Sequence, residues 1–212
     1  MQRTASRDAL PPAGLLRSVL YAGAGGVLHA HEGTVNGAGS ALEWLREHVA
    51  IDVDRALASL SAAPGVAEPP LFMNGVGGLG APFWRPDFPV EFVGEGDDMA
   101  RLASVLESIA FLLCVNLEAL GRSAPLERIL LSGGLARSDY LCRCLAETSG
   151  LAVERNALAE ATARGVAYLA AGEPGSWQAP PLERVFTPAS DALLATRYSR
   201  WRVEMERRGA RL

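Results

Sequence analysis

The sequence predicts an α/β domain in which a mixed sheet is flanked by helices. Near the N-terminus, two short apolar runs are separated by Gly23-Ala24-Gly25-Gly26, which is typical of an antiparallel hairpin. Further along, helix-like and strand-like segments alternate, and Ile129-Leu130-Leu131 is an unbroken apolar run typical of a buried parallel strand. Antiparallel strands followed by alternating helices and strands indicate a mixed sheet.

The N-terminal half is expected to contain a tail, a hairpin and two short helices. The stiff pair Pro11-Pro12 ends the tail, and apolar residues recur at helical spacing in the first helix. Three prolines prevent regular structure in the segment that follows the third strand. In chain order we expect a flexible tail at 1–14, strands at 15–21 and 27–35, helices at 39–49 and 52–61, a stop at Ala63-Pro64-Gly65, a strand at 71–73 and an irregular segment at 75–89.

The C-terminal half contains the longest predicted helix, which begins at Asp97-Asp98 and stops at Gly121. Ser138 is a suitable N-cap for a later helix, and Gly150 a suitable stop. We expect strand 129–131 at the centre of the sheet, with helix 98–120 packed against it. The expected elements are helix 98–120, strand 128–132, helix 138–149, strand 151–155, helix 159–171 and a last helix from Thr187-Pro188 with the apolar stripe Leu194, Tyr198, Trp201 and Met205.

Composition narrows the classes of function. The formal net charge is −4, and all 20 basic residues are Arg, because the sequence contains no Lys. A negative charge argues against nucleic acid as a partner. The absence of Lys excludes a Lys-based phosphate loop and a Schiff-base lysine. We expect no secretory signal and no apolar run long enough to span a membrane, so the expected compartment is the cytoplasm.

The sequence offers no convincing metal site. Cys142 and Cys144 lie two residues apart on a predicted helix and point away from each other, so we expect these thiols and Cys114 to be reduced and to serve packing. His29 and His31 would share one face of a strand, but no second ligand pair accompanies them.

Two glycine motifs suggest ligand binding. Gly75–Gly80 fits the dinucleotide pattern Gly-x-Gly-x-x-Gly, but the prolines after it prevent the helix that this motif requires. Gly133-Gly134 is better placed, because it lies between a predicted buried strand and a helix, where ligands bind in open α/β sheets. A tight turn with no ligand is the alternative. Gly165 in a predicted helix costs about 1 kcal/mol relative to Ala, so a close approach by a ligand or another helix is expected there.

Five sequence blocks, in their order and spacing, resemble the C-terminal domain of the FGGY carbohydrate kinases, and the resemblance covers about 15–201. The blocks are Glu32-Gly33 with Ala38-Gly39 and Trp44-Leu45; Gly78-Leu79-Gly80-Ala81-Pro82-Phe83-Trp84; Leu106-Glu107-Ser108-Ile109-Ala110; Ser132-Gly133-Gly134-Leu135-Ala136; and Glu160-Ala161-Thr162-Ala163.

This resemblance implies an actin/hexokinase-type, ribonuclease H-like lobe, one of two that close on ATP, Mg²⁺ and a sugar or polyol. Gly134 and Ser138 match positions that contact adenosine, where the family commonly has Asn at the second. Gly39 and Glu43 match a second nucleotide-contacting pair, of which the latter is Gln in glycerol kinase. The implied nucleotide-binding residues are Gly39, Glu43, Gly133, Gly134, Ser138 and Glu160, and no protein metal ligand is implied.

The chain also departs from the family. The family has Ala-Arg-Gly where this chain has 87–91, and Leu where it has Arg164. The catalytic Asp of a Gly-Asp pair and the phosphate-binding loop after it would precede Leu15, but 1–14 contains neither, and Asp8 does not fit. No catalytic residue is therefore assigned, and the domain at 15–212 is expected to be incomplete at its N-terminal edge.

The resulting expectation is the C-terminal lobe of an ATP-dependent carbohydrate or polyol kinase, inactive as this chain alone. The chain is expected to be a fragment, a split subunit or a truncated gene product, and a separate N-terminal lobe and a second copy of this chain stay open as partners. The alternative is a non-catalytic adenine-nucleotide-binding or assembly module derived from such a kinase. The sequence does not identify the sugar or polyol substrate, because the residues that contact it would lie outside this sequence.

Overall fold

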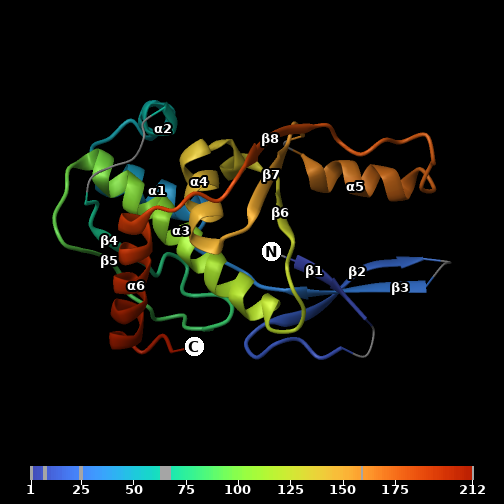
Figure 1. Cartoon of the computed structure of the whole chain (residues 1–212), viewed down its shortest axis with the longest axis horizontal. Coiled ribbons are helices and arrows are strands. Elements are labelled where there is room, and N and C mark those ends of the chain that lie inside the picture. The colour runs from blue at the N-terminus through green and yellow to red at the C-terminus, as the bar shows by residue number, and fades with distance from the viewer. Residues whose placement is uncertain (1, 7–8, 24–25, 63–67, 159, 212) are drawn as a thin grey trace.

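The fold consists of a helical core from which two arms project (Figure 1). The structure, a computed structural model, describes residues 2–6, 9–23, 26–62, 68–158 and 160–211. Its elements are β1 (Gln2–Ala5), β2 (Leu16–Gly23), β3 (Gly26–Glu32), α1 (Gly39–His48), α2 (Val53–Ala62), β4 (Leu71–Asn74), β5 (Val90–Val93), α3 (Asp98–Gly121), β6 (Arg128–Leu131), the 3₁₀ turn η1 (Gly134–Arg137), α4 (Asp139–Ser149), β7 (Ala152–Asn156), α5 (Ala161–Ala170), β8 (Leu182–Phe186) and α6 (Ala192–Arg207).

Three small sheets are present among the described residues. β1, β3 and β2 form an antiparallel sheet in that order, and β4 pairs with β5 antiparallel. In the third sheet, β6 runs parallel to β7, and β7 runs antiparallel to β8. This last sheet confirms the mixed character that the sequence predicts.

The predicted central position of strand 129–131 is wrong. β6 lies at the edge of its sheet, because within the described residues only β7 pairs with it. Its burial alternates: Ile129 is 8% exposed and Leu130 is 62% exposed. α3 packs mainly against α4 and β4 instead of covering β6. An apolar run of this kind favours burial, but the described residues leave Leu130 largely exposed.

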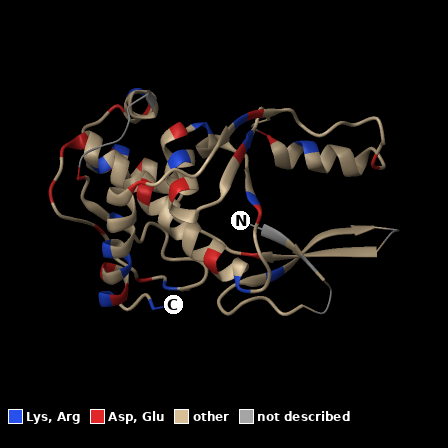
Figure 2. Cartoon of the chain, viewed as in Figure 1, with Lys and Arg blue, Asp and Glu red and all other residues tan. Residues whose placement is uncertain are grey.

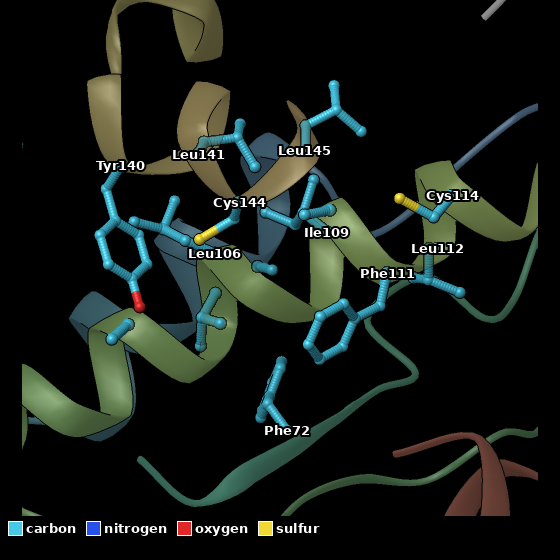
Figure 3. Packing of buried hydrophobic residues seen from close by; sticks show 14 of the residues in the cluster. Phe72, Leu106, Ile109, Phe111, Leu112, Cys114, Tyr140, Leu141, Cys144 and Leu145 are labelled. Carbon is cyan, nitrogen blue, oxygen red and sulfur yellow. The ribbon is translucent and has the colours of Figure 1, made fainter. Parts of the chain in front are cut away.

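Helix α3 forms the centre of the hydrophobic core. Asp97 caps it by accepting a hydrogen bond from the Ala100 N–H at 2.8 Å, as expected for a helix that begins at Asp97-Asp98. Figure 3 shows Ile109 on the side of α3 that faces Leu145 of α4, and Phe111 on the opposite side, toward Phe72 of β4. Contrary to the sequence analysis, α3 is long and apolar enough to cross a membrane, but 89% of its apolar window is buried inside the protein, as in the core helix of a globular domain.

A buried polar cluster joins α3, α4 and α6. The Arg197 guanidinium donates to both carboxylate oxygens of Glu107, at 2.8 and 2.7 Å, and the Tyr140 hydroxyl donates to the same carboxylate at 2.7 Å. Burial acts to lower the pKa of Arg197, but the hydrogen bond and charge of Glu107 outweigh it and raise this pKa. Glu107, which belongs to one of the five family-like blocks, is therefore a structural anchor.

Several elements differ from the sequence analysis. The expected flexible tail contains β1, which pairs with β3, and β5 and β8 were not expected. The last helix begins at Ala192, with Asp191 as its N-cap, and not at Thr187-Pro188. The expected stop at 63–65, the tip of the first hairpin at 24–25, the first residue of helix 159–171 and Asp8 lie outside the described residues.

Two arms extend to the same side of the molecule in Figure 1. One arm is α5, none of whose residues is buried, and the other is the β2–β3 hairpin. The Tyr21 hydroxyl of the hairpin donates a hydrogen bond to the carboxylate of Glu173, just beyond α5, so the arms are tied to each other.

Candidate functional site

The Gly133-Gly134 turn links strand β6 to helix α4, as the sequence predicts. Gly133 has a φ of +99°, a conformation that residues with a side chain rarely adopt, and this lets the chain reverse directly into η1. Ser138 then caps α4: its hydroxyl oxygen accepts a hydrogen bond from the Leu141 N–H at 3.2 Å. Gly150, in the left-handed conformation, ends the helix.

Two cavities lie on either side of this turn. The first, which we call the α2-side cavity, has a volume of about 290 Å³, and the second, the β7-side cavity, about 230 Å³. The α2-side cavity is lined by Leu57, Ala58, Ser61, Gly134, Leu135, Arg137, Ser138 and Asp139. The β7-side cavity is lined by Ser132, Gly133, Ala136, Arg137, Arg155, Asn156, Ala157, Leu158 and Glu183. The apolar floor and few polar groups of the α2-side cavity suit a flat heterocycle.

Arg155 of β7, which the sequence analysis missed, holds the turn in place. Its guanidinium donates to the Ala136 carbonyl at 2.9 Å and to the carboxylates of Asp139 at 2.7 Å and Glu183 at 3.0 Å. Burial acts to lower the pKa of Arg155, but the hydrogen bond and charge of Asp139 together with the charge of Glu183 outweigh it, so this pKa is raised. Arg155 lies on the same face of β7 as the buried Val153, two residues earlier, and that spacing is the signal that could have indicated its burial.

The nucleotide-binding residues implied by the resemblance lie in three places. Gly133, Gly134 and Ser138 lie together in the turn and its cap. Gly39 and Glu43 lie on the first turns of α1, both exposed, and α2 contacts both α1 and α4.

Glu43 forms an ion pair with Arg46, which also donates to Asp54 of α2 at 2.8 Å. Arg46 is shared by two carboxylates, so it offsets only part of the negative charge of Glu43 and Asp54. Glu160 is exposed at the start of α5, where its side chain makes no capping hydrogen bond. Its neighbours Leu158 and Ala161 line cavities, but Glu160 itself lines neither of the two beside the turn.

The carboxylates beside the turn are already neutralised by arginines. Asp139 accepts from Arg155 and forms an ion pair with Arg184, and Glu183 accepts from Arg155. No group of three metal-ligating side chains occurs among the described residues. Mg²⁺ usually reaches phosphate-transfer sites through substrate phosphates and one or two carboxylates. The turn therefore suits the nucleoside end of a nucleotide better than a metal ion.

The second glycine motif serves packing against other parts of the chain. A Cβ on Gly75 would lie 2.0 Å from the Phe88 carbonyl oxygen, and one on Gly80 would lie 2.3 Å from the Thr34 carbonyl oxygen. No helix follows this motif, since the next described element is β5. In agreement with the sequence analysis, which expected no dinucleotide-binding turn here, Gly75–Gly80 packs against other parts of the chain.

The sequence analysis also assigned packing to the three thiols and a close approach to Gly165. Cys114, Cys142 and Cys144 are free and buried, in agreement with packing roles. Gly165 faces open space, with nothing within 4 Å of where a Cβ would be, so the expected close approach does not come from the described residues.

Comparisons with known proteins support the resemblance. The model of the FGGY family of carbohydrate kinases, C-terminal domain, matches residues 4–172. A glycerol kinase from Xanthobacter autotrophicus is 32% identical, over 91% of this chain and 42% of that protein.

The crystal structure of Plasmodium falciparum glycerol kinase with ADP gives a TM-score of 0.78 at 23% identity, covering 94% of this chain and 43% of that one. Xylulose kinase from Lactobacillus acidophilus gives 0.69 at 19% identity, covering 99% and 44%. These structures confirm the actin/hexokinase-type fold. The chain spans less than half the length of these relatives.

Proposed function

This chain belongs to the FGGY family of carbohydrate kinases, as its C-terminal domain, and we propose that it supplies the adenosine-binding lobe of an ATP-dependent kinase for a sugar or polyol hydroxyl. In this proposal the 212 residues bind the nucleotide weakly, and phosphoryl transfer requires groups from a second polypeptide segment.

The observation that carries the proposal is the α2-side cavity beside the Gly133-Gly134 turn. Gly134 leaves the backbone accessible, and Ser138 can still donate its hydroxyl proton, because its oxygen accepts from Leu141. Leu57 and Ala58 provide an apolar wall for adenine. The fit to adenosine also agrees with the ADP in the Plasmodium falciparum relative.

The charges around the turn explain why we expect weak binding. Arg137 lines both cavities, whereas Arg155 and Arg184 are engaged by carboxylates. Most of the affinity for ATP normally comes from charge-assisted bonds to its phosphates. Because Arg155 is already paired with carboxylates, Arg137 is the cation that remains for phosphates among the described cavity-lining residues, and with no Lys in the chain we expect a Kd of about 1 mM.

We expect no general base from the carboxylates that match the family's motifs or lie beside the turn. A sugar hydroxyl needs a base within hydrogen-bond reach at neutral pH. Glu107 is 1% exposed and bound by Arg197, and Asp139 is held by two arginines. Glu160 is free at the surface but lines neither cavity beside the turn. Phosphoryl transfer depends on positioning and charge stabilisation, so we expect no turnover by the chain alone.

An ATP titration followed by backbone amide shifts tests the nucleotide site. We expect shifts at 133–139 and in α2, and their loss in Gly134→Leu. Gly121→Leu is the matched control, because both glycines face open space and neither has a positive φ. Shifts that gather at 75–80 instead, or that survive in Gly134→Leu, would contradict the site.

A coupled ADP-release assay tests catalysis, first on the chain alone and then with the N-terminal portion of a glycerol kinase relative, across glycerol, xylulose and gluconate. Turnover only in the mixture supports the kinase proposal. Turnover by the chain alone would refute the need for a second segment. ATP binding without turnover in the mixture would favour the alternative, a non-catalytic nucleotide-binding or assembly module.

A further inference from the structure

A pocket lies between α5 and the segment that follows it, and the proposed function does not use it. In Figure 1 the chain turns back after α5 and runs beside the helix toward β8. The space between them, which we call the α5 pocket, has a volume of about 280 Å³. Small-molecule pockets begin at about 300 Å³, so the α5 pocket suits a small ligand. It is lined by Leu158, Ala161, Arg164, Gly165, Tyr168, Trp177, Gln178, Ala179 and Pro180.

Aromatic rings form one wall of the α5 pocket. The rings of Tyr168, on α5, and Trp177, in the returning segment, lie 5.7 Å apart at an angle of 49°. Most of the other lining side chains are aliphatic or small. Aromatic pairs contribute stability beyond the area that they bury, so this wall favours a ligand with a flat aromatic ring.

Gly165 keeps space open beside this wall. A Cβ at this position would have nothing within 4 Å, and the backbone does not have a positive φ. Glycine within a helix costs about 1 kcal/mol relative to alanine. Neither packing among the described residues nor backbone conformation explains this cost. A ligand ring that rests on the bare backbone of the helix would explain it.

Arg164 places a positive charge at the α5 pocket. Its guanidinium lies 5.1 Å from the centre of the Trp177 ring and donates to the Gln178 carbonyl at 2.6 Å. Among the described residues no carboxylate forms an ion pair with it, whereas Arg155 and Arg197 are each paired. In Figure 2 the charged segment within α5 is basic. Because a guanidinium has five N–H donors, donors of Arg164 stay available to an anion.

The aromatic wall and the charge together define the class of ligand. A carboxylate matches the fork of a guanidinium, which can bind it through two parallel N–H groups. We propose that the α5 pocket binds a small aromatic carboxylate, whose ring packs on Tyr168 and Trp177 and whose charge pairs with Arg164.

This site goes beyond the proposed function, because it lies apart from the Gly133-Gly134 turn. The α5 pocket shares Leu158 with the β7-side cavity and no residue with the α2-side cavity. Arg164 is also a position at which this chain departs from the family, which has Leu there. The charge that selects the ligand is therefore a property of this chain.

The experiment titrates the full 212-residue chain with indole-3-acetate and follows backbone amide shifts. Indole, which lacks the carboxylate, and cyclohexaneacetate, which lacks the aromatic ring, are the comparison ligands. Arg164→Leu removes the charge, and Arg200→Leu is its control, because Arg200 is an exposed arginine on α6. Gly165→Leu fills the pocket, and Gly121→Leu is its control, because both glycines face open space without a positive φ. Thermal unfolding checks that all four variants are folded.

We expect indole-3-acetate to shift amides at 160–180 and to bind at least about tenfold more tightly than either comparison ligand. Arg164→Leu should weaken binding of the acid by about tenfold and leave indole within about twofold. Gly165→Leu should abolish binding of both, and the two controls should bind like the parent. ATP should not displace the acid, because the nucleotide site lies elsewhere.

Equal losses for the acid and for indole in Arg164→Leu would show that this arginine only supports the shape of the pocket, and would overturn the proposal. Shifts that gather at 133–139, displacement by ATP, or binding that survives in Gly165→Leu would overturn it as well. So would the absence of binding at about 10 mM indole-3-acetate. None of these results bears on the kinase proposal, which the ADP-release assay tests separately.

Discussion

Replacing Glu107 by glutamine should cost far more stability than its position in one helix suggests. The change keeps the shape of the side chain but leaves the Arg197 guanidinium, whose side chain is 10% exposed, without a counter-charge. Removing one partner of a buried ion pair costs about 3–5 kcal/mol. For a chain of this length 1 kcal/mol corresponds to about 2–4 °C, so we expect the unfolding temperature to fall by about 6–20 °C. Thermal unfolding followed by circular dichroism measures this fall in the unfolding temperature.

The same two helices provide a matched control. Glu118 of α3 accepts from Tyr198 at 2.8 Å and from Arg202 of α6 at 2.9 Å, but these carboxylate and guanidinium groups are 42% and 36% exposed. Glu118→Gln should therefore cost only about 0.2–1 kcal/mol. Adding Arg197→Met to Glu107→Gln should restore part of the loss, because it removes the orphaned charge. Equal losses for the two single variants would refute the reasoning that burial sets the cost.

Four further predictions concern the thiols and the turn. Burial raises the pKa of Cys142 to about 11, so iodoacetamide at pH 8 should modify it only after unfolding, as mass spectrometry would show. Because burial raises the pKa values of Cys114, Cys142 and Cys144 on folding, the free energy of unfolding should fall as pH rises above about 8.5, by up to about 1.4 kcal/mol per pH unit for each thiol, checked by urea titrations; a rise there would contradict the assignment. Ser138→Ala should cost about 0.5–2 kcal/mol through loss of the helix cap, with Ser138→Asp retaining it, again by urea unfolding. Gly133→Ala should cost about 1–3 kcal/mol from backbone strain alone, and Gly134→Ala, without a positive φ, much less; equal costs would argue against strain.

Local signals predicted the helices well. The boundaries of α3 and α4 follow from Asp97, Ser138 and Gly150, each of which acts through a backbone group within a few residues. The Gly133-Gly134 turn was likewise readable, since a strand, two glycines and a cap occur in direct succession.

Other features depend on partners distant in sequence. β1 and β8 are short and pair with strands 24 or more residues away, so no local pattern separates them from loops. Arg155 is fixed by Asp139 and Glu183, 16 and 28 residues from it. The apolar pattern of β6 indicates that its side chains favour burial. It does not indicate whether the described residues provide that burial. The roles of Gly39, Glu43, Gly133, Gly134, Ser138 and Glu160 in nucleotide binding all stay predictions.

Arm α5 has a consequence for the lifetime of the protein. Local opening costs least where few contacts are lost, and none of the residues of α5 is buried, although Arg164 and Tyr168 contact the segment that follows the helix. Proteases cut transiently opened chain, so cleavage at Arg164, within this helix, should precede cleavage in the core. A partner that covered α5 would therefore be expected to slow this cleavage and to lengthen the lifetime of the chain.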